Sequence, residues 1–181
     1  MDKTPYTLEV LEKLRKNSHL AKHTHFTSAK RGRSSHVMVG VPVILINLLL
    51  SSVFSYQLVG DGQVFDDEKW VFALLALIGA CLGAVQTFFN FQKNYETHRA
   101  LANRYLAVAR ECERVIASYL DGNIDLKEVD DNTKTLNKEY DKINVDAESF
   151  PTSDRDYQRA LKKQNEKDNF GPSLLEASSR Q

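Results

Sequence analysis

Two long apolar runs dominate the pattern of hydrophobic and polar positions along the chain. Residues 37–59 and 70–91 form runs of 23 and 22 residues without an Asp, Glu, Lys or Arg. Each is long enough to cross a hydrocarbon core of about 30 Å as a helix. The ten residues between them, 60–69, contain two glycines and several acids, which is typical of a polar turn. The pattern predicts a transmembrane hairpin; the alternative, a buried hairpin of a soluble bundle, would normally show a polar stripe.

The flanking segments show helix signals. Thr4–Pro5 is a helix start, and it predicts a short helix to about residue 16, followed by a basic segment without acids. No helix breaker follows the second run before Asp121–Gly122, so the second span should continue as one helix to about residue 120. Asp125 and Ser153 are expected to cap two further helices.

The expected fold class is an all-α membrane protein, in which a two-helix transmembrane hairpin continues from its second span into a cytosolic helical bundle. The predicted divisions are a basic N-terminal helical segment (1–36), the hairpin (37–91, with spans 37–59 and 70–91 and an outer loop 60–69), the bundle (92–170) and a disordered tail (171–181).

Apolar residues of the predicted bundle recur at heptad spacing in two successive helices. Two such seams joined by a short turn predict an antiparallel helical pair, and they could also hold copies of the chain together as a homo-oligomer. The candidate oligomer contacts are Leu101, Tyr105, Val108, Cys112, Val115, Tyr119, Leu136 and Tyr140.

Each span carries small or polar residues along one face. They either pack the two spans of one hairpin together or, when several hairpins assemble, line a water-filled path. Gly79 and Gly83 form a GxxxG spacing, which permits close approach of helix backbones. Pro42 is a potential kink in the first span. The candidate pore or packing residues are Asn47, Ser51, Ser55, Gly79, Gly83, Gln86 and Asn90.

Charge gives the expected orientation. Lys plus Arg equals Asp plus Glu, 24 against 24, so the balance gives no reason to expect direct nucleic-acid binding. Basic residues flank the hairpin on both sides, whereas the loop is acidic, and the positive-inside rule places both termini in the cytoplasm. The acids expected at an outer mouth are Asp61, Asp66, Asp67 and Glu68.

No residue pattern points to catalysis. His19 and His23, four apart, could share a metal on a helix with His25 nearby, but no Cys or carboxylate stands close in sequence to complete the site. Phosphate loops, zinc-protease motifs and nucleophile elbows are absent from the sequence. We therefore expect no catalytic residues, no metal, no cofactor and no enzyme activity.

The basic N-terminal segment, the small-residue hairpin and the stretch HRALANRYLAVAREC at residues 98–112 together resemble the SLATT family, two-span effectors associated with bacterial nucleotide-signalling conflict systems. The resemblance implies a prokaryotic anti-phage effector of the abortive-infection type. Such a protein would oligomerise and permeabilise the inner (cytoplasmic) membrane when a nucleotide-producing or nucleotide-sensing partner detects infection. Two alternatives stay open: a non-conducting membrane scaffold that docks a cytosolic partner, and a peripheral enzyme subunit with its site in the C-terminal helices.

Overall fold

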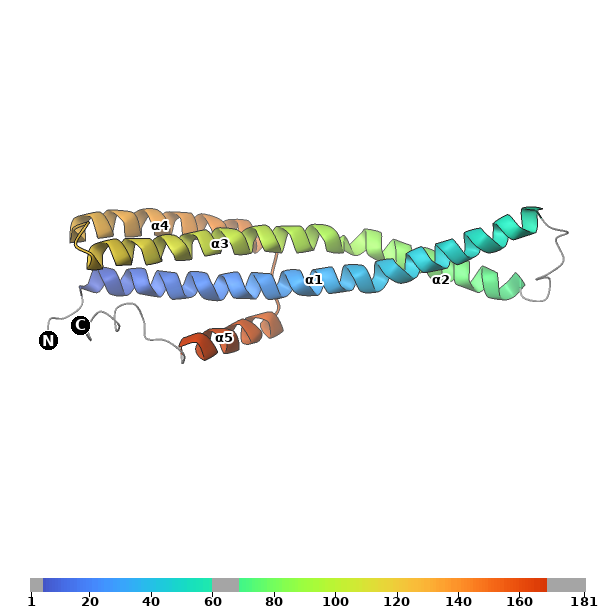
Figure 1. Ribbon diagram of the computed structural model, residues 1–181, viewed down its shortest axis with the longest axis horizontal. Coiled ribbons are helices and arrows are strands. Elements are labelled where there is room, and N and C mark those ends of the chain that lie inside the picture. Colours follow the sequence, from blue (N-terminus) through green and yellow to red (C-terminus); the bar gives the residue numbers. More distant parts are fainter. Residues whose placement is uncertain (1–4, 60–68, 169–181) are drawn as a thin grey trace. The chain divides into compact units, whose positions relative to one another are not determined.

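The computed structural model describes residues 5–59 and 69–168, and five helices account for almost all of them (Figure 1). The helices are α1 (Tyr6–Val59), α2 (Lys69–Phe89), α3 (Phe91–Leu120), α4 (Leu126–Glu148) and α5 (Asp154–Asp168). No strand occurs within these two described ranges. The prediction of an all-α fold is confirmed.

The helices form two compact units. Residues 31–95 make up the first, called the hairpin here, which contains the apolar half of α1, all of α2 and the start of α3. Residues 1–30 and 96–181 belong to the second, called the bundle. The predicted N-terminal segment, 1–36, extends across the boundary between the two units, which lies after Lys30.

The first helix is longer than the sequence suggested. α1 continues through residues 17–36, where a short helix was expected to have ended. Within this stretch Thr24 Oγ1 donates to Leu20 O at 2.9 Å, so its hydroxyl is satisfied inside the helix. Ser18 and Ser28 are buried. Packing in the bundle, more than intrinsic propensity, therefore keeps this polar segment helical.

The bundle is built on α1, α3 and α4, with α1 and α3 antiparallel. Arg15 of α1 contacts Glu113, whereas His25, further along α1, contacts His98, earlier in α3. Buried apolar side chains from all three helices form one core. Its members are Leu8, Leu11, Leu14, Leu101, Tyr105, Val108, Cys112, Val115, Ile116, Val129, Leu136 and Ile143.

A tight glycine turn ends α3. Gly122 has a left-handed backbone with φ +73°, which glycine adopts without a Cβ penalty. Its N–H donates to Tyr119 O at 3.0 Å, and Asn123 N–H donates to Ser118 O at 2.9 Å. These two bonds are the Schellman pattern, so the chain reverses here with its last helical carbonyls satisfied.

The start of α4 is capped as the sequence predicted. Asp125 accepts a hydrogen bond from Glu128 N–H at 2.8 Å, and Asp125 N–H donates to the Glu128 carboxylate at 3.3 Å. This reciprocal capping box satisfies two backbone donors of the first turn.

Helix α5 runs alongside the first half of α1 in the opposite direction (Figure 1). Ser153 caps it by accepting from Asp156 N–H at 3.3 Å, which confirms the predicted cap. Ser28 Oγ donates to Asp156 Oδ2 at 3.0 Å, and Gln164 Nε2 donates to Lys16 O at 3.3 Å. The two ends of α5 are therefore fastened to α1 at points about three turns apart along α1.

Candidate functional site

The two apolar helices of the hairpin pack antiparallel through glycines. A Cβ added to Gly79 of α2 would lie 3.1 Å from Ile46 Cγ2 of α1, closer than side chains normally approach. A Cβ added to Gly40 of α1 would lie 3.4 Å from Gln86 Nε2 of α2. Gly79 and Gln86 therefore serve contact between the two helices of this hairpin.

The second glycine of the GxxxG pair has different surroundings. Apart from Gly83 itself, its two chain neighbours and the adjoining backbone of its own helix, no heavy atom of the described residues lies within 4 Å of the position that a Cβ on Gly83 would take. The close approach predicted for Gly79 and Gly83 together is therefore made within the hairpin by Gly79 alone.

Three polar residues spaced four apart on α1 are exposed within the chain: Asn47, Ser51 and Ser55. Of these, Asn47 also borders α2, because its Oδ1 lies 4.0 Å from the position that a Cβ on Gly79 would take. The neighbouring Ser52 hydroxyl donates to Leu48 O at 2.8 Å, which shows how a serine in this helix can use its hydroxyl hydrogen within its own helix. The asparagine amide has more donors and acceptors than such a bond can use, so Asn47 is the most demanding group of this row.

The second apolar helix ends at an irregular residue. Asn90, expected on the small-polar face, has a left-handed backbone with φ +43° and separates α2 from α3. The hydrogen-bond ladder resumes at once, because Asn94 N–H donates to Asn90 O at 3.2 Å. Asn94 Nδ2 also donates to Phe89 O at 3.1 Å and satisfies that carbonyl. The continuous helix expected to residue 120 is therefore interrupted once, at Asn90.

The acids expected at an outer mouth lie outside the described residues. Those acids are Asp61, Asp66, Asp67 and Glu68.

The predicted seams exist, but they face the chain itself. Five of the eight predicted contacts on α3 and α4 are at most 5 % exposed, and they pack in the core with leucines of α1. Tyr119 and Tyr140 lie against the same core and are partly buried. Five of the predicted oligomer contacts are therefore covered by their own chain in this structure. The five are Leu101, Tyr105, Val108, Cys112 and Val115.

The bundle changes from an apolar to a polar interior along α1. Leucines fill the core near the start of the helix, whereas later positions on the buried side are polar. Burying a polar group is costly unless it is hydrogen-bonded, so most of this part depends on specific partners more than on apolar burial. The exception is Ser18, whose buried hydroxyl has no partner among the described residues. The buried polar residues of this part of α1 are Ser18, Lys22, Thr24, His25 and Ser28.

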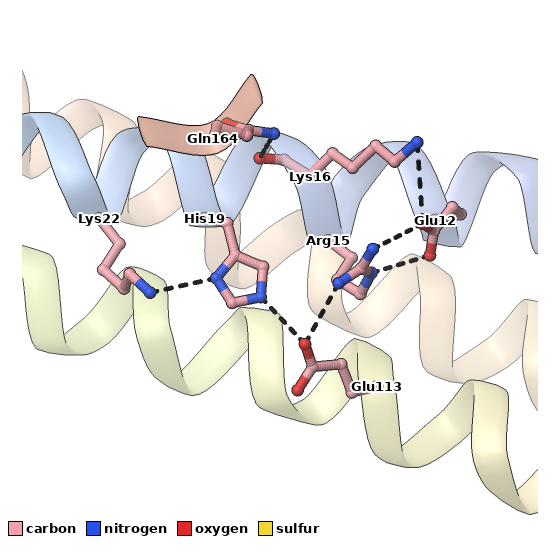
Figure 2. A network of polar contacts seen from close by, with 7 residues as sticks. All are labelled: Glu12, Arg15, Lys16, His19, Lys22, Glu113 and Gln164. Carbon is pink, nitrogen blue, oxygen red and sulfur yellow. Dashed lines mark hydrogen bonds and ion pairs between the residues drawn. The ribbon is translucent and has the colours of Figure 1, made fainter. Parts of the chain in front are cut away.

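A chain of polar contacts joins α1 to α3 (Figure 2). Glu113 of α3 accepts from Arg15 Nη1 at 3.3 Å and lies 3.0 Å from His19 Nε2. Arg15 also pairs with Glu12 at 2.7 Å on its own helix. Burial lowers the pKa of His19, and its contact with Glu113 only partly opposes this. Burial acts to raise the pKa of Glu113, but His19 and Arg15 lower it on balance. This network fixes the register of α1 against α3.

Two histidines meet inside the bundle. His25 Nδ1 and His98 Nδ1 are 3.0 Å apart, so one imidazole donates to the other. The His25 ring also stacks on Tyr105 with centroids 5.5 Å apart. Burial, followed by the neighbouring His98, lowers the pKa of His25 to about 4. At neutral pH His25 is therefore uncharged.

Sequence reasoning missed this histidine pair, although a signal was present. Positions 98, 101 and 105 continue the predicted seam backwards at spacings of three and four. The metal considered for His19, His23 and His25 finds no support in the geometry, since no group of three or more metal-binding side chains occurs among residues 5–59 and 69–168.

The apolar stretches of the hairpin are not core helices. None of the most apolar window of α1, and only 6 % of that of α2, is buried within the chain. Long apolar helices with uncovered sides are typical of membrane spans.

Comparison with known families gives a match over most of the chain. A family model described as SMODS and SLOG-associating 2TM effector domain family 4 matches residues 10–173, which includes both apolar helices and the bundle. Neither the curated proteins nor the solved structures provide a match.

Proposed function

The chain belongs to the SMODS and SLOG-associating two-transmembrane effector domain family 4, and from this premise we propose that it is a non-enzymatic, pore-forming membrane effector of a prokaryotic anti-phage system. It is a membrane protein with two candidate spans, α1 and α2. In the proposal it lies in the inner membrane with both termini in the cytoplasm, and a nucleotide-producing or nucleotide-sensing protein triggers it.

The observation that carries this proposal is the exposure of the polar row Asn47, Ser51 and Ser55, of which Asn47 also borders Gly79 of α2. Two helices cannot enclose a water-filled path, and amide groups facing lipid are costly. Assembly of several hairpins would cover these side chains and surround a path with neutral polar groups. Gly83, with open space beside it, would let a helix of another copy approach closely.

Assembly in this scheme uses the hairpin instead of the seams. Six of the eight seam side chains are buried in the bundle of one chain, so the proposal places contact between copies in the hairpin. The bundle would then act as the regulated part, and its connections to the spans are α1 and the junction at Asn90.

The test is current across planar bilayers that contain the purified full-length protein. Gly83→Leu should abolish conductance, because the Cβ of the new side chain meets nothing in its own hairpin, whereas the side chain would block close contact with another copy. Cys81→Leu is the matched control, since Cys81 is exposed and lies about 200° around the same helix.

Equal conductance in Gly83→Leu, Cys81→Leu and the wild type would contradict assembly through Gly83. A Gly79→Leu variant shows the effect of disturbing the hairpin itself, because its new side chain would clash with Ile46. A lasting absence of current from the wild type, with its triggering partner and signal present, would reject the pore.

Selectivity provides a second test of the pore. If the four acids of residues 60–69 flank the outer mouth, the pore should prefer potassium over chloride. Reversal potentials under a salt gradient measure this preference, and replacing the four acids by their amides should remove it.

One observation favours a non-conducting scaffold as the second candidate. Gln86, in the last turn of α2, lies against Gly40 of the same hairpin, where it can serve packing alone. In that case Gln86→Leu would leave phage protection intact. In the pore, the same change would alter conductance.

A further inference from the structure

A cavity of about 240 Å³ lies in the bundle between α1, α4 and α5. Its walls come from one face of α1, from Tyr140 of α4, from Thr152 in the link to α5 and from Tyr157 of α5. These segments surround one space only while α5 lies along α1, so anything bound there would fasten α5 in place. The α1 residues that line it are Asn17, Leu20, Ala21, Thr24 and His25.

The lining has no formal charge. None of its eight side chains is Asp, Glu, Lys or Arg, and burial holds the pKa of His25 at about 4. A phosphate or carboxylate inside would lose its hydration without gaining a cation, which is strongly unfavourable. The group that fits is therefore uncharged.

The aromatic and polar side chains that line the cavity indicate which kind of uncharged group could bind. Aromatic rings of Tyr140, Tyr157 and His25 border the space, and flat rings stack well on such side chains. Thr24 has already given its hydrogen to Leu20 O, so its oxygen is left to accept. Asn17 can both donate and accept. A ring with its own donors and acceptors could form hydrogen bonds with Asn17 and Thr24.

The volume sets an upper size. Pockets for drug-sized ligands hold about 300–1,000 Å³, and this cavity is smaller. It has room for one planar ring system, so the sugar or phosphate of a larger molecule would stay outside.

We propose that this cavity is a binding site for an uncharged, planar nucleobase-type heterocycle, stacked between the tyrosines of α4 and α5. The ring enters beside Tyr157, whose side chain is 44 % exposed, and its edge bonds to Asn17 and Thr24. Binding holds α5 against α1. The site is independent of the proposed pore, because it lies wholly in the bundle and its occupancy is measured without any current.

The experiment titrates the full-length protein in detergent micelles with the four common nucleosides and, in parallel arms, their 5′-monophosphates, using calorimetry. At least one nucleoside should bind saturably. Its monophosphate should bind no tighter, because no cation lines the cavity. A monophosphate that binds about tenfold tighter or more would overturn an uncharged site.

Two variants locate the binding. Tyr157→Ala removes a stacking ring and should weaken binding about tenfold or more. Ala21→Phe fills the cavity and should abolish it. Tyr6→Ala is the matched control, because Tyr6 is 79 % exposed and does not line the cavity, and it should bind as the wild type does. Circular dichroism checks that each variant keeps its helical content.

Hydrogen exchange provides a readout that adsorption to micelles would not produce. Exchange of the α5 amides should slow when the nucleoside is bound, and it should not slow in Ala21→Phe. The proposal is overturned if no nucleoside binds at millimolar concentration, or if both cavity variants bind like the Tyr6→Ala control.

Discussion

Acid should loosen the bundle, because His25 cannot take up a proton at its usual pH while it is packed against His98 and Tyr105. Its side chain is only 6 % exposed, and its pKa in the folded chain is about 4 against an ordinary value of 6.5. The unfolded chain therefore binds this proton more readily than the folded chain. Stability that is present above pH 6.5 is lost as the pH falls towards 4.

The size of the effect follows from these two pKa values. Between pH 7.5 and pH 5 the linkage relation gives a loss of about 2 kcal/mol in the free energy of unfolding. This is an upper value, since neighbouring rings can shift and admit water. For a unit of about 100 residues it corresponds to a fall of about 10 °C in Tm.

Melting curves of the full-length protein in micelles at pH 7.5 and pH 5 measure the effect by circular dichroism. His25→Gln keeps a polar partner for His98 but cannot titrate, so its Tm should fall much less than that of the wild type. His36→Gln is the control, because it removes a histidine outside the bundle. Equal falls in the wild type and His25→Gln would refute the reasoning, whatever their size.

Substitutions at two positions and one labelling experiment test individual elements. Asp125→Ala removes the cap of the Glu128 N–H and should lower the free energy of unfolding by about 1 kcal/mol, measured by denaturant titration. Asn90→Val should be less stable than Asn90→Gly by about 1 kcal/mol or more in the same assay, because φ is +43° there; equal stabilities would contradict this conformation. Burial raises the pKa of Cys112 to about 12, so its thiol should stay unreactive towards disulfide reagents at pH 8 until the bundle is unfolded, and rapid labelling of the folded protein would count against the packing described.

The spans, the caps and the seams could all be predicted from the sequence, because each leaves a local signal. The apolar runs are long and free of charge, Asp125 stands three residues before Glu128, and the seam residues keep heptad spacing. These signals depend on neighbours along the chain, which are visible without the fold.

The extent of α1 and the break at Asn90 could not be predicted. Polar side chains such as Ser18 and Ser28 occupy the buried side of α1, so the hydrophobic period disappears although the helical period continues. Position 90 is neither Pro nor Gly, the two residues that usually signal a helix break in a sequence. Asparagine is one of the few other residues that adopt a left-handed backbone readily. Heptad spacing also does not reveal which helix packs against the seam, and here that helix is α1 of the same chain.

The GxxxG pair shows why it matters for function whether a packing partner comes from the same chain or from another molecule. Gly79 and Gly83 are equivalent as a motif, yet Gly79 lies against Ile46 and Gly83 has open space beside it. A missing side chain stabilises helix contact only where a neighbour occupies the freed space, so the hairpin of one chain gains nothing from Gly83. If Gly83 acts in packing, its neighbour comes from another molecule. Gly79→Leu should therefore damage the isolated hairpin, whereas Gly83→Leu should damage only what several hairpins do together.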